Sequence, residues 1–119
     1  MKKINLGTWI TTYNPSSVDL ISSFNFDWIC IDLEHSAINL DQLQNLLNVL
    51  DKNKKDSFVR VSSNNKTEIK KVLDLGAKGI IVPMINTASE AKNAISYATS
   101  PPKGQRGFGL ARAQGYGYK

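Results

Sequence analysis

Short apolar runs alternate with amphipathic stretches four times along the first 100 residues. The apolar runs are predicted strands, because they are short and rich in β-branched and aromatic residues. In the stretch that follows each run, apolar residues recur every three or four positions, which predicts a helix with one buried face. The predicted strands are residues 4–10, 27–33, 57–61 and 79–82.

Polar side chains that can cap backbone amides mark where the predicted helices begin. Asn14-Pro15 opens the first helix, in which Val18, Ile21 and Phe24 are spaced to line one face. Each of the other three helices begins with a pair typical of a capping box, in which two side chains three residues apart each accept from the other's amide. These pairs are Asn39 with Gln42, Asn65 with Glu68, and Thr87 with Glu90.

Alternating βα units predict a parallel sheet covered by helices, a fold of the α/β class. Two architectures fit: an open doubly wound sheet, or about half of a (β/α)8 TIM barrel, since a whole barrel needs roughly 250 residues. Residues 1–100 hold the four βα units. Residues 101–119 begin with two prolines and hold five of the eight glycines, so a loop is predicted there. In the barrel architecture, residues 1–119 form a single incomplete domain.

The charge and composition exclude several classes of protein. The chain has 119 residues, 41% of them hydrophobic, and its net charge of +5 comes mostly from the last 19 residues, so a uniformly basic nucleic-acid-binding face is not indicated. A single cysteine, Cys30, excludes an internal disulfide, and a single histidine excludes a Cys/His zinc cluster. No apolar run approaches the roughly 20 residues of a membrane helix, and no signal-peptide pattern follows Met1. We therefore expect a cytoplasmic protein with no membrane partner.

Polar side chains gather where the predicted strands end, and parallel α/β folds bind their ligands at these carboxyl ends. The second strand ends in Asp32-Leu33-Glu34-His35, the third ends in Arg60, and the first supplies Trp9. Composition and spacing alone therefore predict a parallel α/β protein with a polar site.

Each of these residues also has a purely structural interpretation. Arg60 pairs with a carboxylate such as Glu34, because a charge at a buried strand end must be matched. Asp32 and Glu34 cap amides in the turn that follows their strand. His35 begins a loop, and Trp9 packs in the core.

Five segments carry a resemblance that covers nearly the whole chain. They are Leu6-Gly7-Thr8-Trp9; Phe26-Asp27-Trp28 leading into Ile31-Asp32-Leu33-Glu34-His35; Val59-Arg60-Val61; Leu73-Asp74-Leu75-Gly76-Ala77 running into Gly79-Ile80-Ile81-Val82-Pro83-Met84; and Pro101-Pro102-Lys103-Gly104-x-Arg106-Gly107-x-Gly109. In this order and spacing they resemble the HpcH/HpaI aldolase family, whose members cleave 4-hydroxy-2-oxo acids into pyruvate and an aldehyde. A small departure is Ser62, where the family often has proline.

The resemblance implies a (β/α)8 barrel and a role for four residues. His35 matches the histidine that, with a water, handles the proton of the substrate's 4-hydroxyl group. Asp74 matches an acidic partner that orients this imidazole. Arg60 matches an arginine directed at the keto or enolate oxygen, and Trp9 matches an aromatic residue at the substrate site.

The resemblance also implies a divalent cation, Mg²⁺, Mn²⁺ or Co²⁺, that stabilises the enolate. The family's glutamate and aspartate ligands lie on later strands, beyond Lys119, so no metal ligand is assigned in this sequence and the chain looks truncated before them. We expect the complete protein to be an aldehyde-lyase that acts on a small 2-oxo acid, and the 119-residue chain to be inactive alone.

Two other functions remain open. In the first, the chain is a non-catalytic fragment with a role in oligomerisation or interaction. Four strands leave two sheet edges and an apolar face open to a second copy or to a complementing C-terminal half. In the second, residues 101–119 bind nucleic acid through interleaved charged and aromatic side chains such as Arg106, Phe108, Arg112 and Tyr116. Four basic residues are few for that role.

Overall fold

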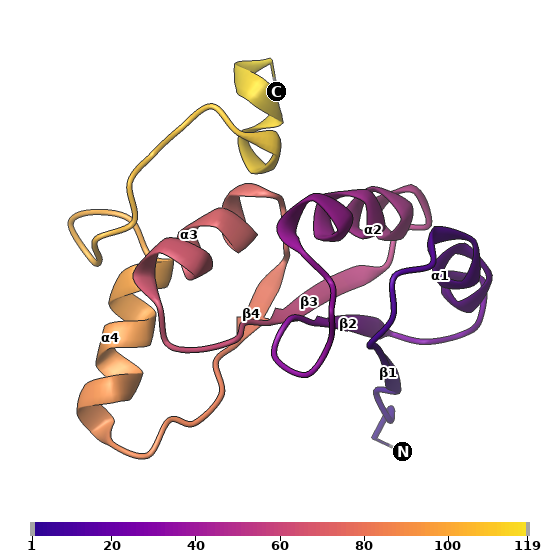
Figure 1. The fold of residues 1–119 in the computed structure, drawn as a ribbon, viewed down its shortest axis with the longest axis horizontal. Coiled ribbons are helices and arrows are strands. Elements are labelled where there is room, and N and C mark those ends of the chain that lie inside the picture. The colour runs from indigo at the N-terminus through magenta and orange to yellow at the C-terminus, as the bar shows by residue number, and fades with distance from the viewer. Residues whose placement is uncertain (1, 119) are drawn as a thin grey trace.

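Four strands form one parallel sheet in the order β1-β2-β3-β4 in the computed structural model, which describes residues 2–118. A helix follows every strand, and a short 3₁₀ segment over Arg112–Gly117 ends the described chain (Figure 1). The parallel α/β fold predicted from the sequence is therefore confirmed. The elements are β1 Gly7–Ile10, α1 Pro15–Ser22, β2 Trp28–Asp32, α2 Leu40–Lys52, β3 Asp56–Arg60, α3 Lys66–Asp74, β4 Gly79–Ile81 and α4 Ala88–Ala98.

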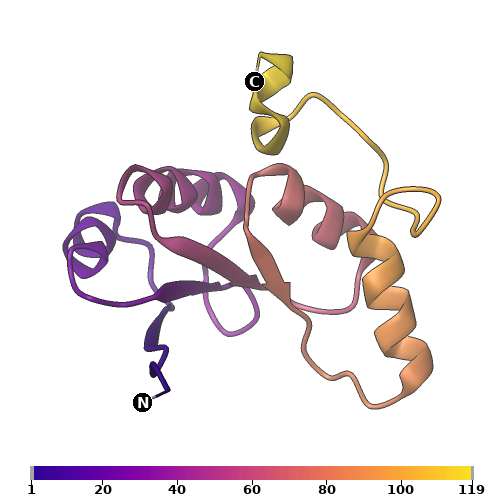
Figure 2. The same ribbon diagram turned by 180° about the vertical axis from the view of Figure 1, so that it is seen from behind.

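The core lies between the sheet and the helices on one of its faces, as both views of the ribbon show (Figures 1 and 2). Ile29 and Ile31 of β2 are fully buried there, against the leucine stripe of α2. Side chains alternate across a strand, so Trp28 and Cys30 lie on the opposite face. On that face the rings of Trp28 and Phe58 meet edge to face with centroids 6.2 Å apart. The leucines of the stripe are Leu43, Leu46, Leu47 and Leu50.

The helix starts confirm most of the predicted caps. Asn39 with Gln42 and Thr87 with Glu90 form complete capping boxes. At α3 only half of the box forms: the Asn65 side chain accepts from the Glu68 amide at 2.9 Å, but the Glu68 carboxylate accepts from the amide and hydroxyl of Ser62. The serine at the position where the family often has proline therefore ties the end of β3 to the first turn of α3. Asn14 caps α1 as predicted.

The first strand and the first helix are predicted two or more residues longer at one end than they form. The first strand begins at Gly7 rather than at residue 4, because β2 pairs with it only over Gly7–Ile10, and Ile4 is exposed. The first helix ends at Ser22, so Phe24 lies beyond it and is also exposed. In both elements the apolar pattern of the sequence continues beyond the residues that have a neighbouring strand or helix to pack against, so the pattern predicts an element that is too long.

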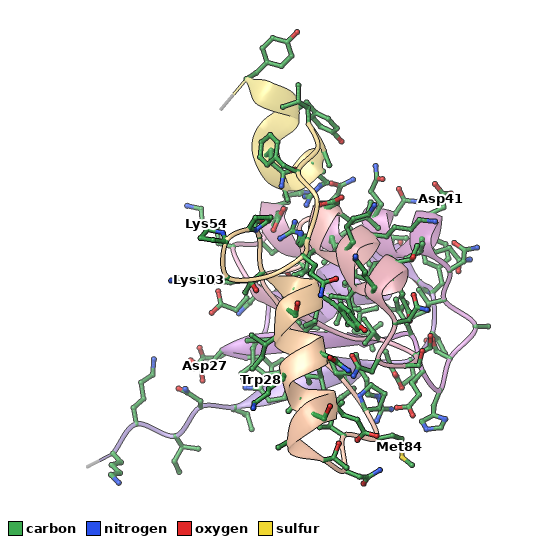
Figure 3. The ribbon with its side chains drawn as sticks, turned by 90° about the vertical axis from the view of Figure 1, so that its left-hand side faces the viewer. Asp27, Trp28, Asp41, Lys54, Met84 and Lys103 are labelled. Atoms are coloured by element: carbon green, nitrogen blue, oxygen red, sulfur yellow. The ribbon has the colours of Figure 1, made fainter. Side chains whose placement is uncertain are left out.

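The C-terminal segment, residues 101–118, stands away from the sheet beside the ends of α2 and α3, on the side away from Met84 (Figures 1 and 3). Arg106 donates to Asp74 at 2.9 Å. Arg112 donates to the Asn48 side chain at 2.7 Å and to the Leu75 carbonyl at 2.9 Å, and it forms an ion pair with Asp51. Two arginines thus hold a segment that was expected to be only a loop.

Within residues 2–118, no helix is long and apolar enough to cross a membrane. Helix α4 is the most exposed of the four long helices: none of its residues is buried, although Ala94, Ile95 and Ala98 line a shallow apolar hollow with Ile80 and Val82.

Candidate functional site

Arg60 and Asp32 form the centre of a polar cluster at the carboxyl edge of the sheet. They are direct partners in the register of β2 and β3, so the sheet itself places their side chains next to each other. The guanidinium donates through Nε to Asp32 Oδ1 at 2.9 Å and through Nη2 to Asp32 Oδ2 at 2.7 Å. This two-point contact fixes the plane of the guanidinium as well as its position.

The carboxylate of Glu34 joins this pair to His35. Its Oε2 lies 3.2 Å from Arg60 Nε, and its Oε1 lies 3.5 Å from His35 Nε2. The Glu34 amide donates to Asp32 Oδ1 at 3.0 Å, which fixes the backbone turn after β2. Ser36 closes this turn, because its hydroxyl donates to the Asp32 carbonyl and accepts from the Ile38 amide.

Trp9 forms the wall of the cluster on the other side. Arg60 Cζ lies 4.8 Å from the centroid of the Trp9 ring, a distance at which the cation and the ring attract each other. The edge therefore brings together three residues that the sequence placed at strand ends, Trp9, His35 and Arg60, with two acids between them. We call these five residues the carboxyl-edge cluster: Trp9, Asp32, Glu34, His35 and Arg60.

Burial within the cluster falls from Asp32 outward. The Asp32 side chain is 1% exposed, Glu34 17%, Arg60 26% and His35 73%. Within residues 2–118 the hydrogen bonds and ion pairs of Arg60 use Nε and Nη2, and none of them uses Nη1. The charges are thus anchored at the bottom, while a guanidinium nitrogen and an imidazole remain available to a ligand at the rim.

Hydrogen bonds set the charge states of the central pair. The hydrogen bonds from Arg60 hold the pKa of Asp32 below its usual value, and those same bonds raise the pKa of Arg60. Both groups therefore stay ionised over the physiological range. Beneath them, burial raises the pKa of the Cys30 thiol to about 11, so this cysteine is an apolar side chain of the inner face rather than a nucleophile.

Asp74 does not join the cluster. A helix that follows a parallel strand runs back along it, so Asp74, the last residue of α3, lies at the amino end of the sheet, whereas His35 follows the carboxyl end of β2. Asp74 pairs with Arg106 instead. Within residues 2–118 Glu34 is the carboxylate beside His35, and a role for Asp74 in orienting the imidazole stays a prediction.

The described residues do not provide a metal site. Residues 2–118 contain no group of three His, Cys, Asp or Glu side chains placed to hold a cation. The nearest approach to one is the Asp32–Glu34 pair, but both Asp32 oxygens accept from Arg60 and Glu34 is shared between Arg60 and His35. A donor set already committed to a guanidinium does not fit a divalent ion.

The sequence predicted Asp32 and Glu34 as caps of the turn that follows their strand, and Glu34 also as a partner of Arg60. Asp32 does accept from the Glu34 amide, and Glu34 does pair with Arg60, so the two acids connect Arg60 to the turn that carries His35. The sequence did contain a signal for the contact between Asp32 and Arg60. Each residue ends a buried strand, the two strands are neighbours, and an acid and an arginine on the same face of such strands lie next to each other.

A parallel βα sheet with a cation, an imidazole and an aromatic ring at its carboxyl edge is typical of (β/α)-barrel proteins, which bind their ligands at that edge. The model of the HpcH/HpaI aldolase/citrate lyase family matches residues 5–115. The chain belongs to this family.

The chain is similar in sequence to curated aldolases, of which two are described here by identity and coverage. The chain is 36% identical over 109 residues to a 4-hydroxy-2-oxo-heptane-1,7-dioate aldolase of Salmonella dublin, covering 92% of this chain and 41% of the relative. It is 34% identical over 113 residues to a 2-dehydro-3,6-dideoxy-6-sulfogluconate aldolase of Pseudomonas putida, covering 94% of this chain and 44% of the relative. The chain thus spans less than half the length of these curated relatives.

Solved structures agree with the fold. An HpcH/HpaI aldolase/citrate lyase family protein of Burkholderia cenocepacia J2315 superposes with a TM-score of 0.90 at 27% identity, over 96% of this chain and 47% of that one. The citrate synthase SbnG superposes with a TM-score of 0.83 at 30% identity, over 87% of this chain and 42% of that one. The HpcH/HpaI aldolases are TIM barrels, so the four βα units correspond to about half of such a barrel.

Proposed function

We propose that the carboxyl-edge cluster is the 2-oxo-acid end of a carbon–carbon lyase site, which cleaves a 4-hydroxy-2-oxo acid into pyruvate and an aldehyde. The observation that carries this proposal is the convergence of Arg60, His35 and Trp9 on one edge, with Arg60 Nη1 left open. The named aldolases among the relatives support it.

In this reaction the residues take distinct parts. His35, acting through a water, accepts the proton of the 4-hydroxyl group as the bond between C3 and C4 breaks and the C4 carbonyl of the aldehyde forms. The electron pair of the broken bond passes to the pyruvyl fragment as its enolate, and protonation at C3 then gives pyruvate. The fixed guanidinium of Arg60 faces the enolate oxygen, where positive charge favours the transition state, and Trp9 packs against the substrate.

The electrostatics of the cluster bear on which further groups the site needs. Arg60 carries one positive charge, while Asp32 and Glu34 carry two negative charges between them. An anionic substrate therefore meets a net negative edge, so the site needs positive charge from outside this cluster. The divalent cation that the resemblance implies would supply it, but residues 2–118 offer no ligand set for it.

A chimera tests the proposal directly. Residues 5–115 replace the aligned part of the Salmonella dublin aldolase, to which they are 36% identical, so that the relative supplies the rest of the barrel. We expect release of pyruvate from a 4-hydroxy-2-oxo acid with added Mg²⁺, Mn²⁺ or Co²⁺, and no EDTA-sensitive release by the 119-residue chain alone. A chimera that has a native circular dichroism spectrum but is inactive, beside an active intact relative, would contradict the proposal.

The open face of the sheet supports a second candidate, a subunit-interaction role without catalysis. Trp28 and Phe58 lie on the face that no helix of residues 2–118 covers, and β1 and β4 each have one unpaired edge there. Contiguous apolar surface of this kind favours association with a second copy or a complementing half. Sedimentation of the 119-residue chain separates the two: a compact monomer near 13.2 kDa argues against this role.

A further inference from the structure

Met84 is an exposed residue with a strained backbone in the loop that follows β4. Its φ is +57°, in the left-handed region that residues with a Cβ rarely adopt. The residue is 79% exposed, so its apolar side chain contributes little to the core. Backbone strain of this kind concentrates at sites that bind ligands, which directs attention to what this side chain contacts.

Hydrogen bonds fix the loop around Met84. The Asn86 side chain donates to the Met84 carbonyl at 3.3 Å. The Glu90 carboxylate accepts from the amides of Asn86 at 2.7 Å and of Thr87 at 3.1 Å. The Asn64 side chain donates to the Glu90 carbonyl at 3.0 Å, which ties this loop to the one that follows β3. The left-handed conformation therefore belongs to a loop that is held in place from two sides.

The register of the sheet places Met84 at the same edge as the carboxyl-edge cluster. Ile81 is the partner of Arg60 in the pairing of β3 with β4. Met84 follows Ile81 by three residues, a stretch of chain that spans no more than about 11 Å. Figure 3 shows Met84 at the end of the molecule opposite Asp27 and Trp28, which mark the amino end of the sheet. Met84 thus lies on the rim beyond Arg60.

Exposure within the cluster indicates which part of a substrate reaches this rim. The 2-oxo end faces the Arg60 guanidinium, which is 26% exposed and rests on the buried Asp32. His35, whose side chain is 73% exposed, acts at the 4-hydroxyl group in the proposed function. Met84 is as exposed as His35, so the carbons beyond C4 are the part of the substrate that extends to its level. A thioether side chain is apolar and adapts its shape to a carbon chain.

We propose that Met84 is a specificity-determining residue that packs against the carbons beyond C4 and favours substrates whose aldehyde part is an apolar carbon chain. This inference rests on the proposed function for the identity of the reaction. The contact between Met84 and a bound 2-oxo acid can be measured without turnover, so the two proposals can fail separately.

The chimera measures the preference for chain length. It is assayed in the direction of synthesis, in which C3 of pyruvate adds to the carbonyl carbon of acetaldehyde or of hexanal. We expect Met84→Ala to lower the hexanal-to-acetaldehyde ratio of kcat/KM by roughly 5- to 50-fold, because each methylene that loses an apolar contact weakens binding by about fourfold. Met84→Leu should keep the ratio. Ile95→Ala, which removes an exposed apolar side chain from α4, is the matched control.

A binding measurement on the chimera needs no catalysis. With ¹³C-labelled methionine methyl groups, the NMR signal that disappears in Met84→Leu is that of Met84. The probe is 2-oxononanoate, which lacks the 4-hydroxyl group and is not cleaved. We expect it to shift the Met84 methyl signal, whereas pyruvate, which ends at C3, should shift that signal much less.

Two results would overturn the inference. One is a hexanal-to-acetaldehyde ratio that Met84→Ala changes by less than threefold, and the other is a Met84 signal that 2-oxononanoate moves no more than pyruvate does. An inactive parent chimera whose Met84 signal still responds to 2-oxononanoate alone would count against the proposed function and support the contact.

Discussion

Arg60 and Arg112 use the same chemistry at opposite ends of the fold. Both are held by carboxylates and both touch residues distant in the sequence. Arg112 donates from Nε to Asn48 and from Nη1 to the Leu75 carbonyl, and its Nη2 pairs with Asp51, so each of its nitrogens is bound within the chain. Arg60 donates from Nε and Nη2 to an acid of its own edge, its guanidinium lies over the Trp9 ring, and its Nη1 has no such contact within residues 2–118.

The difference separates an arginine that ties segments together from one that is prepared for a ligand. A guanidinium whose three nitrogens are all bound inside the protein contributes to stability and has little left to offer a substrate. One that is fixed at two nitrogens and open at the third combines a defined position with a vacant donor.

The largest effect should follow the removal of the imidazole. In the chimera, His35→Ala should lower kcat by roughly 10²–10⁴-fold, as the loss of a positioned acid–base group does. Lys70→Ala, an exposed change on α3, is the control. A decrease in kcat of less than tenfold would show that His35 has a structural role and not a catalytic one.

The two arginines should respond differently to the same substitution. Arg60→Lys keeps the charge but loses the two-point contact, and we expect kcat/KM of the chimera to fall by roughly 10²–10³-fold. Arg112→Lys should leave kcat/KM within about threefold and lower the free energy of unfolding by about 1 kcal/mol. Equal losses of activity in the two variants would show that the division between the arginines is not valid.

Asp32 links the cluster to stability. Its pKa in the folded state lies below the unfolded value, so its contribution is present above about pH 4 and is lost as the pH falls through the lowered value. Asp32→Asn should reduce the free energy of unfolding at pH 7 by about 1–3 kcal/mol, because it leaves Arg60 without its buried partner. Urea unfolding from pH 7 to pH 3 should show the variant and the parent converging as the pH falls. The exposed Asp41→Asn should not reproduce this convergence.

An effect on stability alone is expected at Gly76, behind Arg112. Gly76 has a φ of +98°, and an added Cβ would lie 2.4 Å from Arg112 Nη1. Gly76→Ala should cost about 1–2 kcal/mol of unfolding free energy, from backbone strain and the displaced guanidinium. Gly107→Ala has no atom within 4 Å of its new Cβ and serves as the matched control. If both variants are equally stable, the C-terminal segment is not held through Arg112.

The sequence by itself determined the order of elements, the class of fold and most of the helix starts. These are local or periodic properties: an Asn39–Gln42 pair forms its capping box from residues three apart, and alternation of buried strands with amphipathic helices admits only a parallel sheet. It also determined that Trp9, Arg60 and His35 reach one edge, because the carboxyl ends of parallel strands always lie together.

Only the tertiary structure decided which charges meet. The register of β2 and β3 pairs Asp32 with Arg60, and the turn after β2 brings Glu34 between Arg60 and His35. Asp74 reaches Arg106 rather than His35, because a helix that returns along the sheet carries its last residue to the amino end. Contacts between residues about 30 positions apart depend on strand register and helix length, and no local pattern in the chain encodes them.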